Sequence, residues 1–285
     1  MTEPFSCEKK YIGNFGNPVW ENPTEVMVQA AFDHHGLAFR YNTTEVPADK
    51  LADAVAGAKA MGYKGFNCTL PHKVAVIEHL DGLGESAAIM GAVNCVVERG
   101  GQYIGENTDG KGFLDSLKPV IDPAGKNVLI LGAGGAARAG SVELALAGAS
   151  VITVVNRTAQ RGEELVALLR ERTPVSAAFV GWDGDHEIPS EVEIVVNTTS
   201  IGLFPDNSRV PIAERSLRSE LVVADIIPNP PATRFLAEAR SAGCTTIDGM
   251  GMLVNQGKIG IEYWTGVVPD PSVMRSALES IFGSA

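Results

Sequence analysis

The sequence predicts an α/β protein of two domains, one of which contains a doubly wound parallel sheet. Its 285 residues exceed the usual length of one compact domain. From Lys126 onward, short apolar segments alternate with longer segments whose apolar residues recur with helical periodicity. A glycine-rich segment, Gly132–Ala137, separates the first of these apolar segments from the helix that follows it. Strands and helices in alternation favour a parallel sheet covered by helices on both faces.

The residues before Lys126 also alternate between short strands and helices. Helices are expected where apolar residues recur every three or four positions, and strands where apolar runs are bounded by Gly, Pro or Asn. Two strands, Val93–Glu98 and Gln102–Gly105, are expected to form a hairpin that turns at Arg99-Gly-Gly101. The other expected elements are the helices Thr24–His35, Leu51–Met61, Val74–Leu80, Ser86–Ile89 and Asp109–Leu117 and the strands Ala38–Tyr41 and Gly65–Thr69.

The residues after Lys126 give the more regular part of the pattern. A last pair of helices, about Leu253–Gly266 and Pro271–Phe282, is expected to return to the first domain. We therefore predict a discontinuous α/β domain of residues 1–108 completed by 252–285, and a doubly wound domain of residues 109–251. In the latter, strands are expected at Val128–Leu131, Val151–Val155, Ile194–Thr198 and Leu221–Asp225, and helices at Ala136–Ala147, Ala159–Arg170 and Ala232–Ala242.

Composition and charge exclude several classes of function. The formal net charge of −11 disfavours binding to nucleic acid or to an anionic membrane. The N-terminus lacks the apolar region of a signal peptide, and no stretch approaches the roughly 20 apolar residues that span a bilayer. The cysteines Cys7, Cys68, Cys95 and Cys244 lie far apart and form no C-x-x-C pair, so we expect neither a metal site nor a disulfide framework. Such cysteines fit a reducing compartment, and we therefore expect a cytoplasmic location.

The glycine-rich segment has the sequence and the context of a dinucleotide-binding loop. Gly132 permits a tight turn, Gly134 allows the backbone to approach a pyrophosphate, and the small Ala137 lets the helix pack close to the sheet. The N–H groups and the dipole of the helix then face the anion. The second domain is therefore predicted to be of the Rossmann type, with cofactor contacts from Gly132, Ala133, Gly134, Gly135 and Ala136.

The end of the second strand indicates which dinucleotide binds. An NAD-binding protein usually places Asp or Glu there, against the ribose 2′-hydroxyl. This chain instead has Asn156-Arg157-Thr158, with Arg161 one helical turn later. Two guanidinium groups and a hydroxyl can converge on one dianionic phosphate, so NADP is predicted. Two solvated surface arginines are the simpler alternative, which the preceding glycine loop makes less attractive.

Polar residues also gather at the ends of elements in the first domain. The segment Asn67–Lys73 follows a predicted strand, and Asn94, Asp109 and Gln256 lie at the ends of other elements. Reduction of a ketone by NADPH needs a proton donor, which a lysine held by an aspartate can supply. On local sequence alone, the better interpretation is that Lys73 is a surface lysine and Asp109 a helix N-cap. The histidines at positions 34, 35 and 72 are expected to be structural or solvated.

Taken together, these motifs closely resemble those of the shikimate dehydrogenase family. The loop Asn67-Cys-Thr-Leu-Pro-His-Lys73 is similar to the family's N-V-T-I-P-H-K. The resemblance extends over nearly the whole chain, through Gly91–Asn94, Gly105–Gly110, Gly132–Ala137, Asn156–Arg161, Asn197–Gly202 and Gly249–Gln256.

The resemblance implies NADP-dependent interconversion of 3-dehydroshikimate and shikimate in aromatic amino acid biosynthesis, the chorismate pathway. Residues 1–108 and 252–285 would form the substrate-binding catalytic domain, and 109–251 the NADP-binding domain of a monomer or homodimer. Lys73 would be the acid/base and Asp109 its partner. Ring hydroxyls would contact Thr69, Asn94, Asp109 and Gln256, and the cofactor would additionally contact Thr199, Ile226 and Gly249.

Three departures from the family pattern concern the substrate. Asn22 and Thr24 stand where the family has the serine pair that holds the substrate carboxylate, and they are predicted to bind substrate in its place. The family's histidine in the same motif is Val28, and the tyrosine of D-x-x-Y-N-P is Pro228. The alternatives are a dehydrogenase of quinate or a related cyclohexane or cyclohexene carboxylate, and a metabolite sensor without turnover on the same scaffold.

Overall fold

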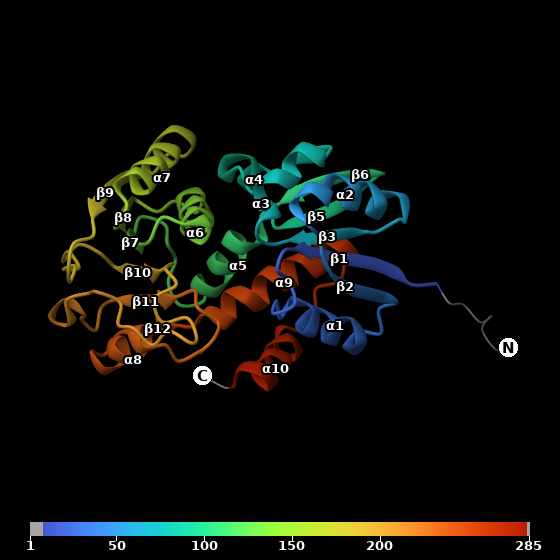
Figure 1. The fold of residues 1–285 in the computed structure, drawn as a ribbon. Coiled ribbons are helices and arrows are strands. Elements are labelled where there is room, and N and C mark those ends of the chain that lie inside the picture. Colours follow the sequence, from blue (N-terminus) through green and yellow to red (C-terminus); the bar gives the residue numbers. More distant parts are fainter. Residues whose placement is uncertain (1–7, 284–285) are drawn as a thin grey trace. The chain divides into compact units, whose positions relative to one another are not determined.

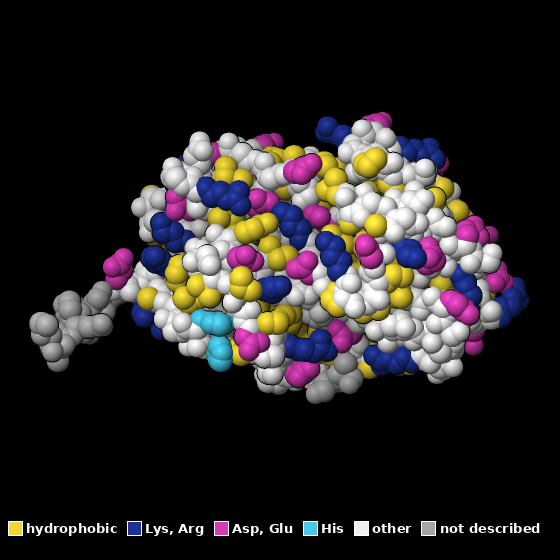
Figure 2. All heavy atoms as spheres, turned by 180° about the vertical axis from the view of Figure 1, so that it is seen from behind, with side chains coloured by type: hydrophobic (Ala, Val, Ile, Leu, Met, Phe, Trp, Pro, Cys, Tyr) yellow, Lys and Arg dark blue, Asp and Glu magenta, His cyan; other side chains and the backbone are white. Residues whose placement is uncertain are grey.

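The computed structural model describes residues 8–283, and its contacts divide the chain into two compact units (Figure 1). Unit 1 contains the chain up to Thr108 together with Gly257–Ala277, and unit 2 contains Asp109–Gln256 together with the residues from Leu278 onward. In this division the chain re-enters unit 1 at Gly257, whereas the sequence-based domain boundary was placed at residue 252. The assignment of a substrate-binding and a cofactor-binding domain stays a prediction. No described helix is long and apolar enough to cross a membrane. On the face drawn in Figure 2, basic and acidic side chains are interspersed.

The sheet of unit 1 is mixed and has the strand order β2-β1-β3-β5-β6-β4. The first three strands along the sheet are parallel, because α1 and α2 return the chain to the same edge each time. The β5–β6 hairpin then adds antiparallel pairs. The strands are β1 (Lys10–Gly16), β2 (Phe39–Glu45), β3 (Gly65–Cys68), β4 (Gly82–Leu83), β5 (Cys95–Arg99) and β6 (Gln102–Glu106).

Side chains in register across the parallel strands share one face of this sheet. Asn14 of β1 lies in register with Thr43 of β2 and Asn67 of β3. Asn14 is buried, and its side-chain oxygen and nitrogen, like Thr43 Oγ1, have no hydrogen-bond partner among the described residues. The next side chain of β1, Phe15, points to the opposite face, where its ring stacks on Phe66 at 4.7 Å.

Helices cover both faces of the sheet of unit 1, with α1 and α2 on opposite sides (Figure 1). Leu51 and Val55 of α2 join the core cluster of Phe15 and Phe66. On the other face, Gln29 of α1 accepts a hydrogen bond from the Tyr41 backbone at 3.2 Å. The helices of this region are α1 (Thr24–His34), η1 (Ala48–Lys50), α2 (Leu51–Ala60), α3 (His72–Ala75), η2 (Val76–His79) and α4 (Glu85–Met90).

Two C-terminal helices, α9 (Gly249–Thr265) and α10 (Pro271–Phe282), each contribute residues to both units. The C-terminal part of α9 is fixed to the sheet of unit 1, because the Trp264 indole N–H donates to the Val96 carbonyl at 3.0 Å. Gly257 allows the close packing of this part of α9, since an added Cβ would lie 2.6 Å from Met27 Cε.

Unit 2 contains the predicted doubly wound sheet, with the order β12-β11-β10-β7-β8-β9 and every pair parallel. The order reverses at β7, whose neighbours are β8 on one side and β10 on the other, so the site for a ligand is expected beyond the carboxyl ends of these strands. The strands are β7 (Asn127–Leu131), β8 (Val151–Asn156), β9 (Ser176–Gly181), β10 (Ile194–Asn197), β11 (Val222–Asp225) and β12 (Thr245–Ile247). The helices are α5 (Thr108–Leu117), α6 (Gly135–Leu146), α7 (Ala159–Arg172), η3 (Glu214–Ser216) and α8 (Arg234–Ser241).

The structure corrects the sequence-based elements in a few places. The single helix expected at Val74–Leu80 is instead the short α3 followed by the 3₁₀ turn η2. Four strands were not predicted, β1, β4, β9 and β12. Strand β4 has only two residues, and glycines, Asn14 and small or polar residues interrupt the apolar patterns of the other three. Helix α9 begins at Gly249, four residues before the expected Leu253.

Candidate functional site

The turn between β7 and α6 has the shape that a pyrophosphate requires. Gly132 has a φ of +108°, and an added Cβ there would lie 2.8 Å from Thr198 Oγ1. At Gly134 and Gly135 an added Cβ would meet no atom within 4 Å, so the backbone at the start of α6 faces open space. The helix N-terminus and the accessible backbone N–H groups therefore fit a dinucleotide.

The end of β8 carries the residues predicted to read the ribose. Asn156 ends the strand, and its side chain donates to the Thr158 carbonyl at 2.9 Å, which fixes the turn into α7. Arg157, Thr158 and Arg161 are all exposed. Since β8 pairs with β7, this cluster lies at the same edge of the sheet as the glycine turn. The tip of β8 therefore carries two arginines and no acidic side chain, an arrangement that suits a 2′-phosphate.

A buried polar cluster joins the ends of β10 and β11. Asn197 donates to Asp225 Oδ1 at 3.1 Å and accepts from the backbone N–H and the hydroxyl of Thr199, at 3.1 and 2.7 Å. Asp225 also accepts from the Ile227 backbone at 3.1 Å and from the Thr233 hydroxyl at 2.7 Å. Burial raises the pKa of the Asp225 carboxyl to about 6, although these hydrogen bonds act in the opposite direction.

This cluster supports two predicted cofactor residues and was not itself predicted. Thr199 is held by Asn197, and Ile226 donates through its backbone N–H to the Asn197 carbonyl at 3.1 Å. A third predicted residue, Gly249, packs against the same loop, since an added Cβ would lie 2.3 Å from the Ile227 carbonyl oxygen. The sequence feature that could have indicated this cluster is the polar residue at the end of each of two predicted apolar strands, Asn197 and Asp225.

In unit 1, the predicted acid/base Lys73 lies in the short helix α3, directly after β3. Thr69 begins the connecting segment, and its carbonyl accepts from the His72 backbone at 2.8 Å. His72 is buried and its Nε2 lies 2.7 Å from the Val46 carbonyl. That contact is structural, as the sequence suggested for this histidine.

The predicted substrate residue Asn94 belongs to a hydrogen-bonded chain that ends beside the predicted partner of Lys73. The Tyr41 hydroxyl donates to Asn67 at 2.6 Å, and Asn67 donates to the Asn94 carbonyl at 2.8 Å. The Asn94 side chain then donates to the Thr108 hydroxyl at 3.0 Å and accepts from the Thr108 backbone at 2.7 Å. Thr108 begins α5, and the next residue, in its first turn, is Asp109. Gln256, the remaining predicted substrate residue, is buried in α9 and donates to the Leu253 carbonyl at 3.1 Å.

Asn22 and Thr24 have different environments, although both were predicted to bind substrate. Asn22 Oδ1 accepts from the Thr24 backbone at 3.0 Å, and Thr24 itself is buried. Asn22 lines a cavity of about 330 Å³ together with Thr69 and Pro18–Glu21. A neighbouring cavity of about 700 Å³ shares Trp20 and Asn22 and extends along α1 to Thr43. Asn22 therefore lines both of these cavities, and Thr24 lines neither.

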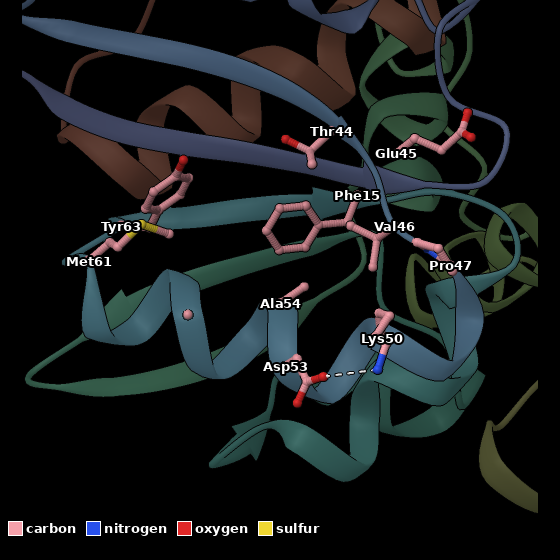
Figure 3. Close-up of a pocket in the computed structure, with 11 residues that line it drawn as sticks. Phe15, Thr44, Glu45, Val46, Pro47, Lys50, Asp53, Ala54, Met61 and Tyr63 are labelled. Carbon is pink, nitrogen blue, oxygen red and sulfur yellow. Dashed lines mark ion pairs between the residues drawn. The ribbon is translucent and has the colours of Figure 1, made fainter.

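A further cavity lies on the opposite face of the sheet of unit 1, beside α2 (Figure 3). It measures about 380 Å³, and Phe15, Val46 and Tyr63 are among its lining residues. Lys50 and Asp53 form an ion pair of 3.7 Å at its edge, drawn as a dashed line in Figure 3. None of the site residues predicted from the sequence lines this cavity.

Comparison with known protein families agrees with these motifs. The chain matches the model of the shikimate dehydrogenase substrate binding domain at residues 15–96, that of shikimate / quinate 5-dehydrogenase at 117–250, and that of the shikimate 5′-dehydrogenase C-terminal domain at 249–279. The chain belongs to the shikimate dehydrogenase family. The predicted family, enzyme class and cofactor are thereby confirmed, and the chain is an NADP-dependent oxidoreductase.

Three relatives show how far the similarity extends. The NADP(+) shikimate dehydrogenase of Methanopyrus kandleri is 42% identical over 278 residues, which cover 95% of this chain and 96% of the relative. A crystal structure of 5-ketofructose reductase of Gluconobacter sp. strain CHM43 is 55% identical, has a TM-score of 0.96, and covers 97% of this chain and 100% of its own. A shikimate dehydrogenase structure in complex with NADP+ is 36% identical with a TM-score of 0.89, covering 99% and 98%.

The loop that precedes α1 departs from the motif that the family resemblance led us to expect. Asn22 and Thr24 replace the expected serines, and Val28, in place of the expected histidine, is fully buried in α1. In unit 2, Pro228 replaces the expected tyrosine in the segment that Asp225 anchors. Lys73 and Asp109, the predicted acid/base and its predicted partner, have the residue types that the family motifs require. The motifs predicted to carry the chemistry are therefore present in this chain, whereas the residues expected at one end of the substrate differ.

Proposed function

We propose that this enzyme interconverts 3-dehydroshikimate and shikimate with NADP(H), and that Lys73 and Asp109 form its acid/base pair. The observation that carries the proposal is that one chain combines the nucleotide loop of unit 2 with the lysine segment of unit 1, as the family models describe. This reaction belongs to the chorismate pathway of aromatic amino acid biosynthesis.

Each proposed catalytic residue has a distinct task. Bound NADP(H) supplies the hydride in reduction and accepts it in oxidation. In the direction of reduction, the ammonium group of Lys73 donates a proton to the ketone oxygen as the carbonyl becomes a secondary alcohol. Asp109 orients the lysine and stabilises its charged form before the transfer. In oxidation the neutral lysine accepts the hydroxyl proton, so the pair serves both directions.

The remaining predicted residues select and orient the substrate. Thr69, Asn94 and Gln256 each carry a hydroxyl or an amide, and these groups form hydrogen bonds with ring hydroxyls. The Tyr41–Asn67–Asn94–Thr108 chain supports this role, because it holds Asn94 and the start of α5 by four hydrogen bonds. Several fixed donors can hold a polyhydroxylated substrate in one orientation for the transfer.

A second candidate is the reduction of an uncharged polyhydroxy ketone such as 5-ketofructose. The relative with that name is 55% identical over nearly all of this chain. The replacement of the expected carboxylate-binding serines by Asn22 and Thr24 favours it as well, because Thr24 is buried and is not among the residues that line the cavity beside Asn22. Both candidates use the same lysine, aspartate and cofactor, and they differ in the group recognised away from the reacting carbon.

One panel of substrates tests both candidates. The purified enzyme is given NADPH with 3-dehydroshikimate or 5-ketofructose, and NADP+ with shikimate, quinate or fructose, and absorbance at the NADPH band is followed. A higher kcat/KM for the shikimate pair than for any other supports the first candidate, and the reverse order supports the second. Replacement of Lys73 by Met should lower kcat by orders of magnitude without unfolding the chain. Thermal stabilisation by NADP+ without turnover of any compound would contradict both and favour a sensor.

A further inference from the structure

The loop between β1 and α1 presents a tryptophan to solvent. The Trp20 side chain is 69% exposed, whereas Trp264 is buried. Trp20 lines both the cavity of about 330 Å³ and the adjoining cavity of about 700 Å³, and Asn22 is the other residue common to the two. An exposed indole beside ligand-sized cavities is a flat apolar surface on which a ligand can pack.

The charges around these cavities are acidic. Glu21 lines the smaller cavity, and Glu25 and Asp33 line the larger one, whereas no Lys or Arg is among the residues that line either. Arg40 lies outside the lining residues and pairs with Asp33 at 3.6 Å. A ligand carboxylate at this place would meet like charge without a lining cation to offset it. The electrostatics therefore favour an uncharged ligand.

Polar groups between the indole and the lysine segment are suited to hydroxyls. Asn22 Oδ1 accepts a hydrogen bond from the Thr24 backbone N–H. The amide N–H groups of Asn22 are therefore the part of its side chain that can donate to a ligand. The Glu21 carboxylate accepts hydrogen bonds, and the hydroxyl of Thr69 both donates and accepts. Thr69 also connects this cavity to Lys73, because it begins the segment that continues into α3.

We propose that Trp20, Glu21, Asn22 and Thr69 form a subsite for the uncharged, hydroxylated end of a polyol substrate, whose C–H groups pack on the Trp20 indole. The π face of an indole is electron-rich and attracts the weakly positive C–H groups of a polyol, while Glu21 and Asn22 bind the hydroxyls at its edge. This inference rests on the second candidate of the proposed function, the NADP-dependent reduction of an uncharged polyhydroxy ketone.

The proposal predicts a separation of KM from kcat. Trp20→Ala should raise the KM for an uncharged polyhydroxy ketone, with 5-ketofructose as the probe, by at least tenfold with kcat changed less than threefold. Trp20→Phe should retain most of the affinity. Glu21→Gln should improve the ratio of kcat/KM for 3-dehydroshikimate to that for 5-ketofructose, because it removes a like charge. Met61→Ala is the matched control, since Met61 is 67% exposed in the same unit but lines a different cavity.

A binding measurement makes the test independent of turnover. Addition of the uncharged ketone or its alcohol should quench the intrinsic tryptophan fluorescence of the wild type and not that of Trp20→Phe. If Trp20→Ala leaves the KM and the quenching unchanged, or if it raises the KM for NADPH as much as that for the ketone, the subsite is refuted. Failure of the wild type to turn over any compound would refute the proposed function instead, and the fluorescence titration would still decide the subsite.

Discussion

The Asn197 amide donates a 3.1 Å hydrogen bond to the Asp225 carboxylate and thereby links the carboxyl ends of two adjacent parallel strands. Both residues are almost fully buried. Each holds a loop that was predicted to touch the cofactor, Asn197 through Thr199 and Asp225 through the backbone of Ile227. The positions of these two loops therefore depend on one buried carboxyl group.

Replacement of Asp225 by Ala should weaken both folding and cofactor binding. The substitution leaves buried donors of Asn197, Ile227 and Thr233 without their acceptor, at a cost of about 1–3 kcal/mol for each one that finds no other partner. We expect a lower free energy of unfolding by urea titration and a higher Kd for NADP+. Asp225→Asn is the conservative control, because its amide oxygen still accepts from two donors and the Thr233 hydroxyl can rotate to accept. An equal loss of stability and of NADP+ affinity in both variants would contradict the conclusion that Asp225 acts through its shape and its hydrogen bonds.

The buried Asp225 carboxyl should also give unit 2 a distinctive dependence on pH. Its pKa is raised from 3.8 to about 6, so the folded state binds a proton more tightly than the unfolded state does. That contribution to stability is complete below pH 4 and is lost as the pH rises through 6, and it amounts to roughly 3 kcal/mol at most. The excess stability of wild type over Asp225→Asn should therefore decrease between pH 4 and pH 7. A difference that stays constant over this range would show that the carboxyl does not titrate there.

Loss of the arginines after β8 should shift the enzyme from NADP toward NAD. Arg157 and Arg161 are exposed and lie at the strand end beside the glycine turn. One charge-assisted hydrogen bond to a phosphate is worth about 1.5–3 kcal/mol, so each Arg→Ala variant should raise the Kd for NADP+ about 10- to 100-fold. The Kd for NAD+, which lacks the 2′-phosphate, should change little. Arg172→Ala, at the far end of the same helix, is the control; equal effects of all three variants on both cofactors would count against phosphate recognition.

Gly249 should tolerate no side chain, although it lies in the first turn of a helix. An added Cβ would lie 2.3 Å from the Ile227 carbonyl oxygen, so Gly249→Ala must displace either α9 or the loop anchored by Asp225. We expect a loss of stability of about 1–3 kcal/mol, as for other overpacked sites. Gly57→Ala in α2 is the matched control, because its Cβ would meet only Met61 Cε at 4.0 Å. That variant should be neutral or more stable by up to about 1 kcal/mol, since alanine favours a helix.

The sequence predicted the parts of the molecule that depend on local pattern. The parallel order around β7 follows from the alternation of apolar strands with helices. The turn after β7 follows from its glycines, because the positive φ of Gly132 is a conformation that other residues rarely adopt. The β1 strand could not be predicted in this way, because Gly13 and Asn14 interrupt its apolar pattern and pairing on both sides provides its stability.

The site was predictable where a motif fixes the residue type and not where residues meet only after folding. Arg157 and the glycine turn are read from sequence alone, but Asp225 and Asn197 are 28 residues apart and come together only because β10 and β11 pair. The same limit applies to Trp20, whose exposure depends on how the loop before α1 lies against Thr69. Spacing along the chain carries no signal for either arrangement.

The unsatisfied Asn14 side chain in β1 has a consequence for heat tolerance. A buried amide without a partner costs about 1–3 kcal/mol relative to an apolar group of the same shape, and the Thr43 hydroxyl opposite it is also without a partner among the described residues. Asn14→Leu, which keeps the branched shape of the side chain and replaces its two polar atoms by methyl groups, should therefore raise the melting temperature. A variant that melts earlier would instead mean that this asparagine is satisfied in solution. If it melts later, the topology does not require a polar residue at this position of β1, and one substitution there is enough to raise the thermal stability of the enzyme.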